Sequence, residues 1–442
     1  MHTLEQLRRG ELDGAHVLRL RGGLQELPAD VLRLADTLEV LDLSGNQLVA
    51  LPDWLPQLPK LRILFGSNNP FEVLPPVLGE CAALSTIGFK SCRIAQVPAQ
   101  ALPPQLRWLI LTDNAIAALP ETLGHCTRLQ KLALAGNRLP ALPDSMAGLH
   151  ALELLRISAN RFTALPHWLG DLPRLAWLGY AGNPFCVEQE RQVLAQQGLP
   201  AIDWAQLELG TMLGHGASGV IHQARWNGDQ EAGRQVALKL FKGAVTSDGL
   251  PDSEMATWMQ AGSHERLISL LGRLDRHPEQ AQGLVMPLIG PQYHALAGPP
   301  SLESCTRDVY PSGLRLALPQ VLRIALDLAR VLAHLHAQGV LHGDFYAHNT
   351  LHDGAGGVLV GDFGAASLLP SGPAQSLALQ RVEVRAWAYL LEELLAHAGA
   401  AVTPAQQAQA AALCRLLADC LCENPDQRPL MHEVVARLQP AA

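Results

Sequence analysis

The chain lacks any excess of basic charge. Acidic residues outnumber basic ones, 41 to 33, across 442 residues, which gives a formal charge of -8 and a pI near 6.1. Nucleic acids and anionic lipid surfaces are bound through clustered lysine and arginine. We therefore expect no nucleic-acid partner.

The sequence also lacks a long uninterrupted apolar run. The amino-terminal segment MHTLEQLRRGELDGAH has no apolar core of the length that a secretory signal needs. The most apolar long stretch, residues 321–341, is broken by Arg323, Asp327 and Arg330, and charged residues are costly in lipid. We expect no membrane span and a cytoplasmic location, although the sequence does not decide whether the protein is delivered to a host cell.

Paired cysteines of the kind that bind zinc are missing as well. The eight cysteines are scattered and form no C-x-x-C pair, and Cys420 and Cys422 are separated by a single residue. That spacing is poor for metal ligands, and dense disulfide frameworks belong to small secreted domains. Reduced, mostly buried thiols are the expected state.

The first half, in contrast, repeats one pattern. Segments such as LEVLDLSGNQLVALP at Leu38 and LRWLILTDNAIAALP at Leu106 recur in seven regular units, with a step of 23 residues and one step of 22. Leucines at the first, fourth and sixth places would point inward from a short strand, so that stacked units bury one continuous core. The ninth place holds an asparagine that can satisfy backbone groups, which predicts an asparagine ladder; Cys92 takes this place in the third unit. The ladder residues are Asn46, Asn69, Asn114, Asn137, Asn160 and Asn183.

This pattern resembles the leucine-rich repeat family, which implies an α/β solenoid (horseshoe) over residues 1–187. The strand positions facing the concave side are unusually apolar, and such patches often bind proteins. We expect a protein substrate or regulator on this face; the alternatives are that the patch docks against the second half of the same chain, or that the side chains of its neighbours cover it. The positions are Val40, Asp42, Ile63, Phe65, Trp108, Ile110, Lys131, Leu154, Arg156 and Trp177.

The second half carries residues suited to chemistry. LGHGASGVIHQA places Gly214, Gly216 and Gly219 in G-x-G-x-x-G spacing between strand-like residues, a weak signal by itself. VALKLF then places Lys239 inside an apolar strand, where a lysine needs a charged partner. Glu254, on a predicted helix, is the expected partner, with Asp252 as the alternative.

Further on, GLVMPLIG predicts a buried strand that ends near Met286. An amphipathic helix then leads to HGDFYAHN, with Asp344 and Asn349, and VGDFG follows with Asp362. Asp344 and Asp362 are each preceded by glycine and followed by phenylalanine.

In this order the motifs resemble the protein kinase family over residues 206–438, with residues 188–205 as cap and linker. The resemblance implies an α+β two-lobed domain that uses ATP and Mg²⁺. Asp344 would accept the proton of the substrate hydroxyl, Lys239 held by Glu254 would bind phosphates, and Asn349 with Asp362 would hold the metal. The nucleotide site would comprise Gly214, Gly216, Gly219, Ile221, Ala237, Lys239, Met286 and Leu288.

Several positions depart from the family pattern. Gly343 stands where many kinases carry an arginine that pairs with a phosphorylated activation segment, so switching by such a phosphate is not expected. Tyr346 replaces a lysine that touches the γ-phosphate, a role that His348 is a candidate to fill. The segment after Gly364 is short and has no A-P-E triplet, and Glu383 replaces an aspartate expected at the start of the next helix. Arg428 has therefore lost its usual glutamate partner, and either Gln380 or Glu383 is a candidate substitute.

The sequence thus predicts a serine/threonine protein kinase whose repeats recruit a substrate or regulator, of a bacterial type. Two alternatives remain: a pseudokinase scaffold, and a small-molecule phosphotransferase of the aminoglycoside-kinase type. The filled catalytic positions argue against the first alternative, and the glycine loop, VALK and NPDQRP argue against the second.

Overall fold

The structure is a computed structural model that describes residues 2–196, 198–216, 218–228, 233–243, 246 and 248–439. The chain divides into two compact units, Met1–Leu172 and Pro173–Ala442. The last repeat and its cap therefore belong to the second unit. Within the described residues, no helix is both long and apolar enough to cross a membrane.

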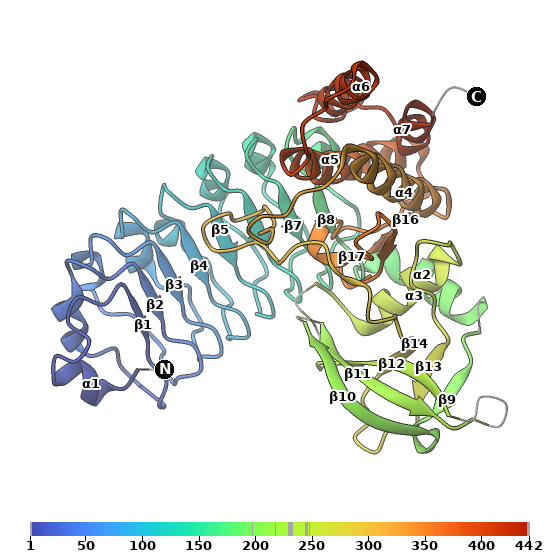
Figure 1. The fold of residues 1–442 in the computed structure, drawn as a ribbon. Coiled ribbons are helices and arrows are strands. Elements are labelled where there is room, and N and C mark those ends of the chain that lie inside the picture. Colours follow the sequence, from blue (N-terminus) through green and yellow to red (C-terminus); the bar gives the residue numbers. More distant parts are fainter. Residues whose placement is uncertain are drawn as a thin grey trace. The chain divides into compact units, whose positions relative to one another are not determined.

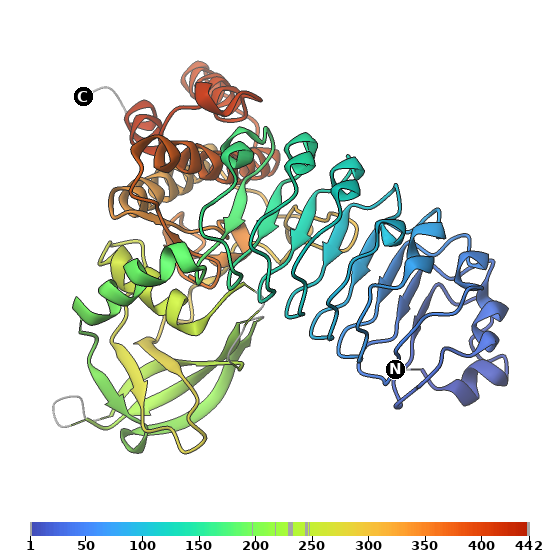
Figure 2. The same cartoon turned by 180° about the vertical axis from the view of Figure 1, so that it is seen from behind.

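The first unit is a series of parallel strands, one for each repeat, preceded by α1 (Leu4–Arg8). Neighbouring strands pair in register, so that Leu41 lies opposite Leu64 and Leu109 opposite Leu132, and these central leucines are fully buried. Short 3-10 turns follow the strands and line the outer side of the unit (Figures 1 and 2). The strands are β1 (Val17–Arg19), β2 (Val40–Asp42), β3 (Ile63–Phe65), β4 (Thr86–Gly88), β5 (Trp108–Ile110), β6 (Lys131–Ala133) and β7 (Leu154–Arg156); the turns are η1 (Ala29–Leu34), η2 (Leu55–Gln57), η3 (Pro76–Glu80), η4 (Ala99–Ala101), η5 (Glu121–His125), η6 (Asp144–Gly148) and η7 (His167–Asp171).

The predicted asparagine ladder is present in this unit. The amide nitrogen of Asn137 donates to the carbonyls of Leu111 and Leu134, at 2.8 and 2.9 Å, and its oxygen accepts from the backbone of Ile116 at 3.1 Å. Asn46, Asn69, Asn114 and Asn160 make the same kind of bonds. Cys92, at the ladder place of the third unit, reaches two carbonyls only through its thiol, at 3.5 and 3.6 Å.

The second unit opens with β8 (Trp177–Gly179) and α2 (Pro184–Gln196), followed by a mixed sheet and α3 (Pro251–Ala261). The strand order of the sheet is β10-β11-β12-β14-β13-β9. Its core side is apolar because alternate residues of β12 and β14, among them Val236, Leu238 and Val285, point to one face. The strands are β9 (Ala201–Asp203), β10 (Leu207–His215), β11 (Gly219–Trp226), β12 (Arg234–Phe241), β13 (Gly272–Asp275) and β14 (Gly283–Pro287), with the turn η8 (Trp204–Gln206).

The remainder of this unit is mainly helical and is built around α5 (Pro373–Ala396). This helix is buried over most of its circumference, and the indole of Trp387 donates to the carbonyl of Ala325 at 3.1 Å, which ties α5 to α4. Glu383 lies inside α5, not at its start as predicted, because the helix already begins at Pro373. The other elements are α4 (Leu318–Ala337), α6 (Pro404–Cys420), α7 (Met431–Leu438), β15 (His294–Ala295), β16 (Val340–Leu341), β17 (Thr350–His352), β18 (Val358–Val360), β19 (Ser367–Leu368), η9 (Ala347–Asn349) and η10 (Pro425–Gln427).

Candidate active site

Lys239 joins two carboxylates at the centre of the second unit. Its ammonium lies 2.5 Å from Glu254 Oε1 of α3 and 3.2 Å from Asp362 Oδ1. Burial alone would lower the pKa of Lys239, but the charges of Asp362 and Glu254 raise it above its ordinary value. Asp252 instead accepts a hydrogen bond from Gln282 at 3.0 Å, so the alternative partner is wrong.

The glycine loop connects β10 to β11. The amide of Gly216 donates to the carbonyl of Gly219 at 2.9 Å. A Cβ on Gly219 would lie 2.5 Å from the carbonyl oxygen of Leu240, whereas a Cβ on Gly214 would meet no atom of the described residues within 4 Å. Gly219 is therefore required by the packing of β11 on β12, while Gly214 leaves open space beside the backbone. Such space lets a phosphate approach the loop, so the residues present fit a bound nucleotide.

The predicted nucleotide-contacting residues lie on adjacent strands. Ile221 is opposite Lys239 across β11 and β12, and Ala237 is opposite Met286 across β12 and β14. Ala237 and Met286 are buried, and Leu288 follows directly after β14, where it is partly buried. The sheet thus places these predicted nucleotide-contacting residues next to one another on adjacent strands.

The loop after β16 holds Asp344, predicted as catalytic, and Asn349, predicted as a metal ligand, in one bonded group. His342 Nε2 lies 3.0 Å from the carbonyl of Gly361, and the Asp344 amide donates to His342 Nδ1 at 3.3 Å. Asn349 donates from Nδ2 to the backbone carbonyl and to Oδ2 of Asp344, at 2.9 and 2.8 Å. Because Nδ2 makes these bonds, the Oδ1 oxygen of Asn349 is available to a hard cation such as Mg²⁺.

Asp362 adopts a backbone conformation that L-residues rarely take. Its φ angle is +57°, and such strain persists only where the surroundings impose it. The next residue, Phe363, is fully buried and stacks on Trp258 of α3 with centroids 5.0 Å apart. Desolvation opposes ionisation of Asp362, but the ammonium of Lys239 outweighs it and lowers the pKa of this carboxyl. The anionic form needed to hold a metal is thereby favoured.

His348 has a partner that the sequence did not reveal. Asp308 accepts from the His348 backbone amide at 2.9 Å and lies 2.8 Å from its Nδ1. Burial would lower the pKa of His348, but the hydrogen bond to Asp308 and the nearby Asp344 charge raise it. No motif marks Asp308, because it lies 40 positions earlier in an irregular segment. Tyr346 is buried and stacks face to face on Trp177 at 4.1 Å.

Arg428 makes none of the contacts predicted for it. It donates to the backbone carbonyls of Pro173 at 2.6 Å, Cys422 at 2.9 Å and Arg381 at 3.2 Å, and neither Gln380 nor Glu383 is its partner. Because burial without a carboxylate disfavours the cation, the pKa of Arg428 falls to about 10. Glu383 instead accepts from the Gly343 amide at 2.7 Å and lies 2.9 Å from His336 Nε2.

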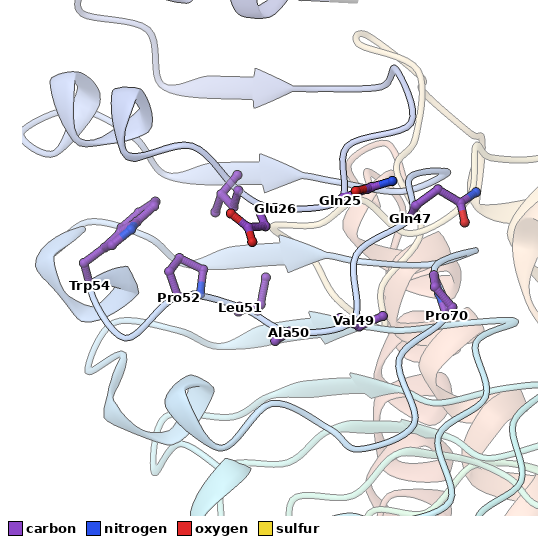
Figure 3. Close-up of a pocket in the computed structure, with 10 residues that line it drawn as sticks. Gln25, Glu26, Gln47, Val49, Ala50, Leu51, Pro52, Trp54 and Pro70 are labelled. Atoms are coloured by element: carbon purple, nitrogen blue, oxygen red, sulfur yellow. The ribbon is translucent and has the colours of Figure 1, made fainter.

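The first unit contains a surface depression of its own (Figure 3). It lies among the loops that follow β1, β2 and β3 and is lined by Gln25, Glu26, Leu27, Gln47, Val49, Ala50, Leu51, Pro52, Trp54 and Pro70. None of the predicted site residues is among them. Among these lining residues, Glu26 is the one with an ionisable side chain.

Comparisons with protein families match the two halves of the chain to different families. Residues 207–389 match the family "Protein tyrosine and serine/threonine kinase". Residues 104–162 and 127–185 match one leucine rich repeat family, and residues 37–58 match another.

Curated relatives match parts of the chain. It is 29% identical over 158 residues to "Probable serine/threonine-protein kinase gdt4" of Dictyostelium discoideum, which is 36% of this chain and 8% of that protein. It is 27% identical over 159 residues to human "Kinase suppressor of Ras 2", 34% of this chain and 14% of that protein. It is 31% identical over 99 residues to mouse "Leucine-rich repeat and calponin homology domain-containing protein 1", 22% of this chain and 14% of that protein.

The chain therefore spans less than a fifth of the length of each of these relatives. Fold, site geometry and family matches nevertheless agree on its two parts. The protein joins leucine-rich repeats to a protein kinase domain.

Proposed function

We propose that the protein is an ATP- and Mg²⁺-dependent protein kinase that transfers the γ-phosphate of ATP to serine or threonine hydroxyls. The observation that carries this proposal is the position of Lys239, which contacts both Glu254 and Asp362. The contact links β12, α3 and the Asp362 loop, three elements that a phosphotransferase must bring together.

Each residue has a role in this proposal. The backbone of Gly214, Gly216 and Gly219 covers the phosphates, and Lys239 binds the α and β phosphates. Asp362 and Asn349 hold Mg²⁺, which when bound neutralises charge on the transferred group. Asp344 accepts the hydroxyl proton while the substrate oxygen bonds to the γ-phosphorus and the bond to the ADP oxygen breaks. Glu254 keeps Lys239 in place and does not touch the substrate.

The repeats supply recognition in this proposal. Phe65, Trp108 and Ile110 are partly exposed on the predicted concave positions, and Lys131 lies 4.2 Å above the ring of Trp108. Partly exposed aromatic side chains are typical of protein-binding surfaces. A protein substrate or regulator would bind there.

The test is phosphate transfer by purified protein with Mg²⁺ and γ-labelled ATP. Asp344→Asn keeps the size of the side chain but removes the proton acceptor, and we expect transfer to fall about 10²- to 10⁴-fold. Asp53→Asn, at an exposed position of the first unit, is the matched control and should leave the rate unchanged.

The outcomes separate the possible functions. Label on this chain or on added protein, lost in Asp344→Asn, supports the proposal. Nucleotide binding without transfer would contradict it in favour of a pseudokinase scaffold. Transfer only to small metabolites would instead favour a small-molecule phosphotransferase.

A further inference from the structure

Trp177, in the last repeat strand β8, contacts the catalytic loop directly. Its indole N–H donates to the carbonyl of Phe345 at 3.0 Å, and its ring stacks on Tyr346 at 4.1 Å with planes 8° apart. The side chain is only 2% exposed. Phe345 and Tyr346 are the two residues that follow Asp344, so Trp177 fixes the backbone on one side of that aspartate.

Tyr180, three residues later, holds the short segment after Gly364. Its backbone amide donates to Ser367 Oγ at 3.0 Å, and its hydroxyl donates to the carbonyl of Leu368 at 2.9 Å. Tyr180 is fully buried. Ser367 and Leu368 form β19, which pairs with β16 just before the catalytic loop. One tyrosine of the last repeat therefore anchors the strand that follows the Asp362 loop.

Two departures from the kinase pattern are explained by contacts with residues 173–178. Gly343 has a φ angle of +73°, and a Cβ there would lie 2.5 Å from the Ala365 oxygen and 2.6 Å from the Leu178 oxygen. An arginine at this position would collide with the backbone of β8. Arg428, whose usual partner is absent, donates to the carbonyl of Pro173 at 2.6 Å. Gly343 is thus adapted to the last repeat, and Arg428 to the residue pair just before it.

The cap helix α2 reaches the other half of the site. Glu190 of α2 accepts from Ser253 Oγ at 2.8 Å and from the Gly182 amide at 2.9 Å, and it is buried. Ser253 immediately precedes Glu254 in α3. A Cβ on Gly182 would lie 2.8 Å from Leu250 Cδ1, so the cap packs tightly against the start of the helix that carries Glu254.

From these contacts we propose that residues 173–190 take over the positioning role of the shortened activation segment, with Trp177 and Tyr180 as positioning residues for phosphate transfer. The last repeat holds the backbone around Asp344 and β19 in place, while its cap helix α2 packs against α3. The catalytic residues are then held together without phosphorylation of a loop. This inference rests on the proposed kinase function.

Two conservative variants of the full chain test it. Trp177→Phe keeps an aromatic ring over Tyr346 but removes the bond to Phe345, and Tyr180→Phe removes only the bond to Leu368. Trp168→Phe is the matched control, because Trp168 is also a buried repeat tryptophan whose indole bonds to a side chain, Asp144, within the first unit.

Steady-state kinetics and amide hydrogen exchange are both measured. We expect kcat to fall about tenfold or more in Trp177→Phe and Tyr180→Phe with the KM for ATP unchanged, because small displacements of reacting groups are costly. In these two variants the rate of amide hydrogen exchange should rise over residues 342–350 and 365–369 and should stay unchanged in the interior of α4. Trp168→Phe should match the wild type in both measurements.

Amide hydrogen exchange tests this inference independently of the proposed function. If the wild type transfers no phosphate, the kinase proposal fails. Local amide hydrogen exchange still tests whether Trp177 and Tyr180 hold the backbone around Asp344 and β19 in place. Unchanged exchange in both variants, or a uniform rise that includes α4, overturns the inference. So does locally raised exchange with a wild-type kcat.

Discussion

Glu393 shows how burial of a single carboxyl can make stability depend on pH. It lies on α5, where it accepts a hydrogen bond from the Tyr310 hydroxyl at 3.0 Å, and its side chain is 17% exposed. Burial and the nearby charge of Asp308 raise its pKa to about 8. The protonated form therefore predominates in the folded protein at neutral pH, although Arg307 lies 3.9 Å away.

At the residue scale we predict that Glu393→Gln flattens the pH dependence of unfolding. Because the folded pKa lies above the ordinary 4.5, stability from this group is present below pH 4.5 and is lost as pH rises through 8. Between pH 6 and 8 the free energy of unfolding of the wild type should fall by about 2 kcal/mol, and that of the variant should not show this fall. Urea denaturation at both values measures the difference, and equal losses in the two proteins would contradict the prediction.

The repeated element shows a local defect in an otherwise regular ladder. Asparagine at the ninth place of a repeat bonds to carbonyls on two turns and accepts an amide hydrogen, as Asn69 does with Leu43, Gly66 and Leu48. Cys92 supplies only weak thiol contacts at this place. The carbonyl of Gly66 already lies within its reach.

At this element scale we predict that Cys92→Asn stabilises the first unit. Each added amide bond contributes about 1 kcal/mol, so a gain of roughly 1–2 kcal/mol is expected in thermal or urea unfolding. Cys92→Ala, which removes the thiol without adding an amide, is the control and should show no gain. An asparagine variant no more stable than the alanine variant would rule out this account of the ladder.

The whole molecule consists of two compact units, of which only the second holds the predicted nucleotide residues. A ligand that binds the folded state alone stabilises it by mass action, by about 2.7 kcal/mol at 100 times its dissociation constant. The effect should therefore appear in one unit.

We predict that ATP with Mg²⁺ protects the second unit from unfolding and leaves the first unchanged. Hydrogen exchange in rising urea distinguishes peptides of the two units. Lys239→Met should lose the protection because the phosphates lose their cation, whereas Lys60→Met, at an exposed position of the first unit, should keep it. Equal protection of both units, or protection that persists in Lys239→Met, would contradict nucleotide binding at this site.

The sequence alone determined the two architectures and the order of the site residues. Repeats every 23 residues specify strands and an asparagine ladder because each unit makes the same local contacts. The partnership of Lys239 with Glu254 was also predictable, since a lysine in an apolar strand needs a charge and few carboxylates lie nearby in sequence.

Only the tertiary structure decided which partners meet across long separations. It assigned Asp308 to His348, Pro173 to Arg428 and Glu383 to Gly343, and it buried Trp177, predicted as a concave-face residue, against Tyr346 of its own chain. Three of these four contacts involve backbone groups or ring faces, which leave no residue-type signature in a sequence. Glycine at position 343 marks a close approach, but one of the two carbonyls that require it, that of Leu178, is 165 positions away and is brought there only by folding.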